Sequence, residues 1–315
     1  MRLMLAPMQG VLDYTLRDIL TSIGGYDRCV TEFVRVTTQA VPKHVFYRYC
    51  PELREGGTTP AGTPVYVQLL GSHPQWMAHN AAVAARLGAR GIDINFGCPA
   101  KIVNNNQGGS VLLQEPQRVH NIVREVRQAV DAAVPVTAKI RLGFHDSSLL
   151  PEIVAGIVEA GATELCIHAR TRQQGYRPPA YWAEIGAIRP QTPIPVIANG
   201  EIWSAIDAQA AQTQSGCTDL MLGRGALSYP DLALQIRTGL SGQAYTPLAW
   251  EESLQLLHRY ADRLQGQAPI SAAGFIKQWA NYLRRQSPPA EAFFQHIKCM
   301  KQPSEMMASM LPNAG

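Results

Sequence analysis

The chain alternates eight times between a short apolar run rich in β-branched residues and a longer, more polar connection. The runs span residues 3–8, 29–34, 65–71, 92–97, 136–143, 164–170, 195–200 and 219–225. Most are too continuously apolar for a strand with one wet face, which is typical of parallel strands covered on both sides. Helical periodicity appears in the connections over 74–87, 116–130 and 203–214. The alternation predicts an α/β fold, a (β/α)8 TIM barrel that ends near residue 240.

The pattern changes after residues 241–247, and no strand-like run follows. Residues 249–265, 271–286 and 290–301 have helical periodicity, and the Ser-Pro-Pro segment at 287–289 separates the last two. We therefore predict two domains. The first is the barrel, residues 1–243, and the second is a small all-helical C-terminal domain, residues 244–315.

Composition and cysteine spacing restrict the class of protein. The chain has 315 residues, 46% of them hydrophobic and 17% charged, enough to bury a full core. Pro7 interrupts the first apolar stretch, and no later run is long enough to span a bilayer. The six cysteines are far apart with no Cys-x-x-Cys pair, which argues against zinc sites and disulfides. We expect a cytoplasmic monomer without a metal or a membrane partner.

Positive charge is concentrated near the C-terminus. The net charge of +4 is too small by itself to indicate a nucleic-acid partner. Residues 270–301, however, contain Lys277, Arg284, Arg285, Lys298 and Lys301 against Glu291 alone. In residues 275–285, the basic side chains fall on one helical stripe, and Trp279 falls on the apolar stripe. The basic stripe fits either a solvated helix face or a contact with nucleic acid.

Unusual polar residues lie where the predicted strands end. They are Gln68, Asn95, Cys98, Lys139, Arg141, His168, Arg170, Asn199, Glu201 and Arg224. The carboxyl ends of barrel strands converge on one mouth, so these side chains should meet there. The last two strands end in "ANGEI" and "GRG", where glycines allow backbone N–H groups to approach a phosphate and Arg224 adds charge. Tight turns alone would also explain these glycines.

Lys139 leaves two kinds of chemistry open. A lysine in a barrel mouth can form a Schiff base, or its cation can stabilise the reduced form of a flavin. The neighbours favour a flavin, because Pro7 and Met8 offer an uncharged surface for a ring. Gln68 can bond the polar edge of that ring, and His168 can serve the phosphate. Cys98, on a Gly/Pro turn at a strand end, fits a packed thiol or a reactive one.

Several segments together resemble one family over nearly the whole chain. They are "LAPMQGV", "VQLLG", "DINFGCPAKIVNNNQGGSVLL", "KIRLG", "HARTRQQGY", "NGEI" and "GRGAL". In order and spacing they resemble the tRNA-dihydrouridine synthases. "TEFVR" at 31–35 and "IKQW" at 276–279 are similar to the bacterial C-type enzymes, which act on uridine 16. Phe275 departs from the family pattern, which has a basic residue there. The sequence from "YRPPAYW" onward also differs from the one that is commonest in the family.

The resemblance implies an FMN enzyme that reduces the C5–C6 bond of a uridine in tRNA, with NADPH as the reductant. Cys98 matches the family's proton donor, and nearby Lys101 would lower the pKa of its thiol. The predicted cofactor-binding residues are Pro7, Met8, Gln9, Gln68, Lys139, His168, Asn199, Gly200, Glu201, Gly223, Arg224 and Gly225. The predicted tRNA-binding residues are Arg35, Asn95, Lys101, Tyr176, Lys277, Trp279, Arg284 and Arg285. For Trp279, core packing is an equally good interpretation.

Two other functions remain compatible with the residues. One is another barrel enzyme with a phosphate-bearing cofactor, either a flavin reductase of free pyrimidines or a Schiff-base enzyme using Lys139. The other is a tRNA-binding protein without catalysis. The basic helical segment argues against a reductase of free pyrimidines, because such an enzyme has no use for it.

Overall fold

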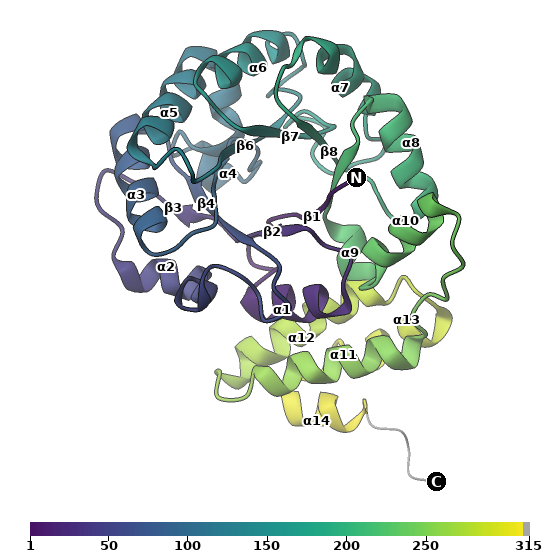
Figure 1. Cartoon of the computed structure of the whole chain (residues 1–315). Helices are drawn as coiled ribbons and strands as arrows, with labels where there is room; N and C mark the ends of the chain where they lie inside the picture. Colours follow the sequence, from purple (N-terminus) through teal and green to yellow (C-terminus); the bar gives the residue numbers. More distant parts are fainter. Residues whose placement is uncertain (311–315) are drawn as a thin grey trace.

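A closed parallel barrel forms the body of the molecule (Figure 1). The structure is a computed structural model that describes residues 1–310. Its strands are β1 (Leu3–Leu5), β2 (Arg28–Val30), β3 (Val34–Arg35), β4 (Val65–Leu70), β5 (Ile92–Asn95), β6 (Val136–Arg141), β7 (Glu164–His168), β8 (Val196–Asn199) and β9 (Asp219–Leu222). Every pairing is parallel, and β1 joins β9 to close the ring. The predicted (β/α)8 fold is confirmed.

The second barrel strand is broken into two pieces. Both β2 and β3 pair with β4, so together they occupy one position in the ring. The sequence predicts a single strand over 29–34 there. Residues 31–33 separate the two pieces, and Gln9 accepts a hydrogen bond from the backbone N–H of Phe33 at 2.8 Å. The break therefore ties the second strand to the loop that follows β1.

Helices form a ring around the barrel (Figure 1). They are α1 (Tyr14–Ile23), α2 (Lys43–Tyr49), α3 (Pro74–Arg86), α4 (Lys101–Asn104), α5 (Pro116–Ala129), α6 (Leu150–Glu159), α7 (Trp182–Ile188), α8 (Ala205–Ser215), α9 (Arg224–Ser228) and α10 (Leu232–Ser241). The predicted helices over 74–87, 116–130 and 203–214 correspond to α3, α5 and α8. The connection 35–64 contains α2 and one turn of 3-10 helix, Pro51–Glu55.

The chain after the barrel is helical. It forms α11 (Trp250–Arg263), α12 (Pro269–Leu283), α13 (Pro288–Ile297) and α14 (Pro303–Ala308). The first three correspond to the predicted helices, whereas the sequence analysis did not predict α14. These helices lie beside α1 and α9 at one edge of the barrel (Figure 1). Residues 311–315 of the predicted helical domain lie outside the described residues, and the domain boundary at 243 stays a prediction.

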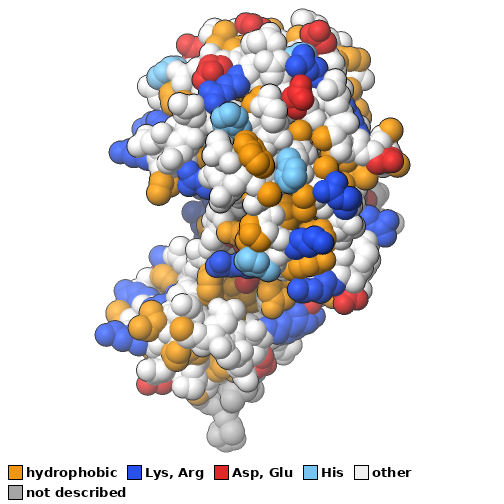
Figure 2. All heavy atoms as spheres, turned by 90° about the vertical axis from the view of Figure 1, so that its left-hand side faces the viewer, with side chains coloured by type: hydrophobic (Ala, Val, Ile, Leu, Met, Phe, Trp, Pro, Cys, Tyr) orange, Lys and Arg blue, Asp and Glu red, His pale blue; other side chains and the backbone are white. Residues whose placement is uncertain are grey.

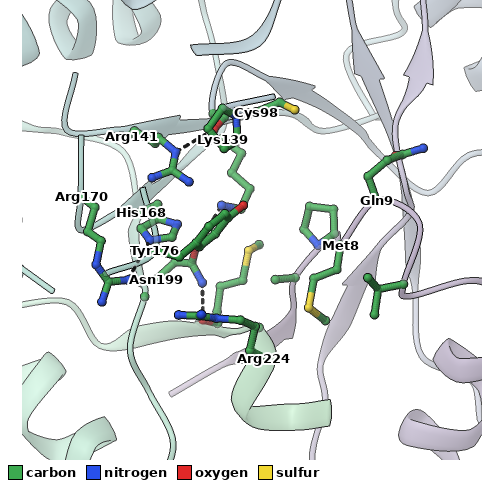
Figure 3. A pocket seen from close by; sticks show the side chains of 18 of the residues that line it. Met8, Gln9, Cys98, Lys139, Arg141, His168, Arg170, Tyr176, Asn199 and Arg224 are labelled. Carbon is green, nitrogen blue, oxygen red and sulfur yellow. Dashed lines mark hydrogen bonds between the residues drawn. The ribbon is translucent and has the colours of Figure 1, made fainter. Parts of the chain in front are cut away.

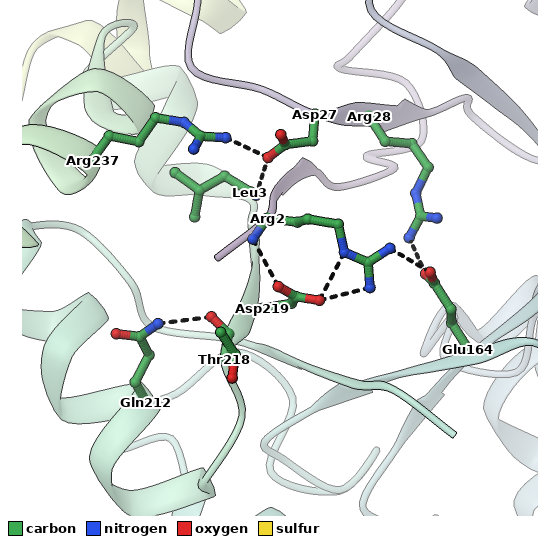
Figure 4. A network of polar contacts seen from close by, with 9 residues as sticks. All are labelled: Arg2, Leu3, Asp27, Arg28, Glu164, Gln212, Thr218, Asp219 and Arg237. Carbon is green, nitrogen blue, oxygen red and sulfur yellow. Dashed lines mark hydrogen bonds and ion pairs between the residues drawn. The ribbon is translucent and has the colours of Figure 1, made fainter. Parts of the chain in front are cut away.

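An ionic network holds the amino-terminal ends of the strands together (Figure 4). The Arg2 guanidinium donates to both Glu164 and Asp219, at 2.5 and 2.6 Å, and the backbone N–H of Arg2 also donates to Asp219. Arg28 donates to the second oxygen of Glu164 at 2.6 Å. These contacts join the first strands of the barrel to β7 and β9 at the end opposite the mouth.

Candidate active site

A cavity of about 620 Å³ opens at the carboxyl ends of the barrel strands (Figure 3). The predicted residues that line it are Pro7, Met8, Gln9, Gln68, Asn95, Cys98, Lys139, His168, Tyr176, Asn199, Gly200, Glu201, Gly223, Arg224 and Gly225. The structure therefore brings all the predicted cofactor-binding residues together with Cys98. Tyr282 of α12 also lines the cavity, so the helical segment contributes to its wall.

Strand periodicity places the polar side chains inside the barrel. Successive residues of a strand face opposite sides, so every second residue points inward. On β6 these inward residues are Thr137, Lys139 and Arg141, whereas the intervening Ala138 and Ile140 belong to the apolar layer under the helices. The same alternation on β5 turns Asp93 and Asn95 inward. The cavity floor is consequently polar although the strands are buried on both sides.

Positive charge dominates the cavity. Lys139, Arg141, Arg170 and Arg224 all line it, and Glu201 is the only carboxylate among the described lining residues. Burial lowers the pKa of Lys139, whose Nζ donates to Asn199 Oδ1 at 3.0 Å. Burial and the neighbouring cations hold the pKa of His168 well below its usual value, so its ring is neutral at pH 7. The site is built to receive a negatively charged group.

Glu201 organises the arginines on one side of the cavity. Its carboxylate accepts hydrogen bonds from Arg170 and from the indole of Trp203, and Arg224 lies 3.4 Å away. Burial raises the pKa of Glu201, but the hydrogen bonds from Arg170 and Trp203 outweigh it and the net shift is downward. The preceding Gly200 has a φ of 114°, and a Cβ there would lie 3.2 Å from the His168 ring. Glycine thus permits the close approach of this loop to His168.

A relay of hydrogen bonds runs from the barrel interior to the turn that carries Cys98. The buried carboxylate of Asp93 accepts from Gln68 Nε2 at 2.7 Å. Gln68 Oε1 accepts from Asn95 Nδ2 at 2.8 Å. Asn95 Oδ1 in turn accepts from the backbone N–H groups of Gly97 and Cys98, both at 2.9 Å. Because a carboxylate only accepts, Asp93 fixes the orientation of both amides and so holds the Cys98 turn.

Burial raises the pKa of the Cys98 thiol above its ordinary value of 9.0. A backbone N–H at Ala100 and the charge of Arg141 oppose this shift without cancelling it. The cation that opposes it is therefore Arg141, not Lys101 as the sequence analysis expected. Lys101 begins α4, is exposed and does not line the cavity. A half-buried, protonated thiol at the cavity rim is equipped to donate a proton.

Aromatic rings cover the arginines at the mouth. Tyr176 is 51% exposed, and its ring centroid lies 5.0 Å from the Arg141 guanidinium carbon and 5.2 Å from that of Arg224. The Trp203 ring stacks similarly with Arg224 and with Arg285. Arg141 and Arg170 are predicted at the mouth without an assigned role, whereas Trp203 and Tyr282 are cavity residues that are not among the predicted ones. Trp203 could have been predicted as a mouth residue, because it lies only two residues after Glu201 in the loop that follows a strand.

The predicted RNA-binding residues of the helical segment do not form one surface. Trp279 is 1% exposed and packs in the core, which agrees with the core-packing interpretation of this residue and not with an RNA contact. Lys277 donates to the Met300 carbonyl, and Arg284 forms an ion pair with Glu291 at 2.5 Å. Arg285 alone is exposed and stacks on Trp203 at the cavity mouth. Helical periodicity could not show which neighbouring groups bind the Lys277 and Arg284 side chains.

Arg35 lies apart from the main cavity. It is exposed and lines a second, smaller cavity of about 170 Å³ together with Thr37, His73 and Asn106.

Among residues 1–310, no helix is long and apolar enough to cross a membrane. No group of three or more His, Cys, Asp or Glu side chains that could hold a metal ion occurs within that same range.

Comparison with known proteins identifies the family. Residues 4–313 match the family model described as dihydrouridine synthase (Dus). The tRNA-dihydrouridine(16) synthase of Shewanella oneidensis is 53% identical, over 98% of this chain and 96% of that protein. Proteins of the same name from Pasteurella multocida and Ralstonia nicotianae are 49% and 47% identical, and each alignment covers at least 94% of either chain. The chain belongs to the dihydrouridine synthase family, whose members are flavin-dependent oxidoreductases acting on tRNA.

Solved structures with similar folds are more distant. Histamine dehydrogenase from Rhizobium sp. 4-9 superimposes with a TM-score of 0.58 at 16% identity, over 76% of this chain and 46% of that one. A 2-naphthoyl-CoA reductase gives 0.57 at 11% identity, over 77% of this chain and 50% of that one. This chain thus spans about half the length of each. These likenesses support the barrel fold.

The relay predicts that breaking its central link loosens the Cys98 turn. Gln68→Met keeps the side-chain length but removes both amide contacts, so alkylation of Cys98 should accelerate up to about fivefold, the equivalent of one hydrogen bond. Peptide-resolved labelling with iodoacetamide measures this rate. Thr137→Val is the matched control, because it removes a bond to Asp93 outside the relay. Equal labelling of Cys98 in both variants would contradict the relay.

Proposed function

We propose that this protein reduces the C5–C6 double bond of uridine 16 in tRNA, with FMN as cofactor, NADPH as reductant and Cys98 as proton donor. The observation that carries the proposal is the position of a protonated thiol at the rim of a cationic cavity. Identity of 53% to a tRNA-dihydrouridine(16) synthase over nearly the whole chain supports both the substrate and the position.

The cavity suits FMN in charge and shape. Met8 lies opposite Lys139 and His168 (Figure 3), and the adjacent Pro7 also lines the cavity, so this wall is uncharged. We assign the phosphate to the loops of Gly200 and Gly223, with Arg224 and Gly225. At Gly225 a Cβ would lie 2.2 Å from the Ile202 carbonyl oxygen, so only glycine fits that turn. Lys139 is placed to offset negative charge on the ring, and neutral His168 offers a donor without charge.

The polar lining gives the ring edge a limited set of partners. Asn199 accepts from Lys139 and donates to the Met221 carbonyl. Gln68 Nε2 donates one hydrogen to Asp93, which leaves its second hydrogen for a ligand. Gln9 is engaged with the Phe33 N–H, so its contribution is to shape the wall. When bound, FMN supplies the hydride that reduces C6 of the uracil, and NADPH restores it.

Cys98 completes the reduction by protonating C5. Negative charge develops on the uracil as C6 is reduced, and a thiol at the rim can quench it with a proton. The raised pKa keeps Cys98 protonated at neutral pH. The guanidinium of Arg141 then stabilises the thiolate that remains, because it bonds the Gly97 carbonyl at 2.8 Å and lies next to this turn. Asn95 holds the turn and has one amide hydrogen left for the uracil edge.

The tRNA is proposed to dock across the mouth and the adjoining helical segment. A uridine in folded tRNA has to leave its stack to reach the cavity, at a cost that is lowest for a loop base. Exposed Tyr176 can stack on such a base, and Arg35, Lys101 and Arg285 can bind phosphates. Figure 2 shows Lys and Arg side chains gathered near the waist between barrel and helices. Lys277 and Arg284 are weaker candidates because each already has a partner.

Replacing the proton donor tests the reaction directly. Wild-type protein loaded with FMN and NADPH should form dihydrouridine at position 16 of unmodified tRNA, as mapped by mass spectrometry. In Cys98→Ala, flavin reoxidation by tRNA in a single turnover should slow about 10²- to 10⁴-fold, the usual contribution of a general acid. Cys299→Ala, at an exposed cysteine, is the control. A Cys98→Ala rate near wild type would exclude the proton-donor role.

The pKa of Cys98 sets the pH dependence of the same step. A proton donor acts only while protonated, and burial raises this pKa above 9.0. The single-turnover rate should therefore stay level through neutral pH and fall only in the alkaline range, at a higher pH than that at which an ordinary thiol ionises. A decline that begins near pH 7 would show that the thiol is ionised too easily to act as the acid.

Two cations should control FMN retention. Lys139→Met and Arg224→Ala each remove a charge facing the proposed cofactor, and each should weaken FMN binding by about tenfold or more. Flavin fluorescence titration of the apoprotein measures the affinity. Lys43→Ala, at an exposed lysine on α2, should leave it unchanged. Wild-type affinity in both cavity variants would mean that the cofactor lies elsewhere.

The dependence of tRNA binding on salt tests the docking surface. Each phosphate contact releases about one counterion, so Arg285→Ala should reduce the slope of log Kd against log salt by about 0.9. Arg284→Ala is the matched control, and its effect should be smaller because Glu291 already neutralises Arg284. An unchanged slope for Arg285→Ala would leave the helical segment without a role in phosphate binding.

A further inference from the structure

We propose that Trp279 is a positioning residue through which the helical segment holds α9, and hence Arg224 and Gly225, in place for the cofactor. The inference rests on the proposed function for the identity of that cofactor. Trp279 itself lies in the core and does not line the cavity. Its influence therefore has to pass through the backbone that it contacts.

The short helix α9 depends on α12 for the partners of its last carbonyl groups. The final carbonyls of any helix lack intrahelical donors, and α9 has only five residues. Trp279 Nε1 donates to the Leu227 carbonyl at 3.1 Å, and Gln286 Nε2 donates to that of Ser228 at 2.8 Å. Tyr229, directly after α9, donates from its hydroxyl to the Arg285 carbonyl at 3.3 Å. One end of α9 thus enters the cavity and the other is capped by the helical segment.

The same indole is also connected to the opposite wall of the cavity. Trp279 meets the Tyr260 ring edge-on, at 5.4 Å between centroids and 89° between planes. The Tyr260 hydroxyl lies 3.4 Å from Asp13 Oδ2, and Asp13 caps α1 through the Leu16 N–H at 2.9 Å. Asp13 follows the loop that carries Pro7 and Met8. The helix α12 packs against α9, and α11, which carries Tyr260, packs against α1 (Figure 1).

The contacts give Trp279 a measurable effect on a ligand that it does not touch. Affinity falls in proportion to the fraction of molecules whose site is correctly arranged. Without the indole N–H, the Leu227 carbonyl loses its partner, and α9 should occupy other positions more often. FMN would then bind less tightly although every cavity side chain remains.

The test compares Trp279→Phe with wild type in the full-length apoprotein. Phenylalanine keeps an aromatic ring against Tyr260 but removes the donor. Amide exchange of residues 226–229 should accelerate about fivefold, and FMN affinity by fluorescence titration should weaken about three- to tenfold. The salt slope of tRNA binding should stay at the wild-type value, because Trp279 is buried.

Two further variants keep the result interpretable. Trp250→Phe, at a half-buried indole that packs on Phe293 in the same domain, should change neither quantity. If Trp279→Phe does not fold, Gln286→Leu removes the neighbouring donor from a half-buried position and decides the question. The inference would be overturned if amide exchange at residues 226–229 were unchanged in Trp279→Phe. It would also be overturned if Trp250→Phe lost as much amide protection and FMN affinity as Trp279→Phe. Failure of wild type to bind FMN would instead refute the proposed function, while the exchange data would still test the positioning role.

Discussion

The buried carboxylate of Asp93 determines how the polar interior of this barrel is arranged. Burial raises its pKa, and the hydrogen bonds from Gln68 and Thr137 work against that shift. An acceptor at this point permits only one orientation of the Gln68 amide, which in turn determines that of Asn95. The turn bearing Cys98 is thus fixed from below, by groups that are buried. The hydrogen-bonded network of the barrel interior thus supports the turn that carries Cys98.

Much of the fold and of the site follows from the eight strand-like runs and from the general anatomy of a parallel barrel. The strand runs located the barrel, and the rule that their carboxyl ends converge located Lys139, His168 and Arg224 around one cavity. What the sequence could not show is how the amides are paired: Gln68 and Asn95 both line the cavity, and they also bond each other. Which side chain each amide bonds depends on the distances between neighbouring strands, and the sequence of one strand does not determine these distances.

The helical segment was harder to predict than the barrel. Three of its helices follow from their periodicity, whereas α14 was not predicted. The basic residues of the predicted stripe have different neighbours in the structure. Arg284 faces an acidic residue on the next helix, and Trp279 faces the barrel. A helical pattern identifies which residues share a face, but the element that covers that face is set by tertiary packing. This is why the helical pattern alone left two interpretations of Trp279, an RNA contact and core packing, and only the tertiary structure shows the indole buried.

The ionic network that joins Arg2 to Asp219 has a consequence for synthesis on the ribosome. The partners are 217 residues apart, and β1 has no closing strand until β9 has emerged. At typical translation rates that interval lasts about 10 to 40 s. During it, the first strand has an unpaired edge and Arg2 lacks the carboxylate of Asp219. The nascent barrel is therefore open for most of its synthesis, and during that time its unpaired strand edge is exposed to aggregation.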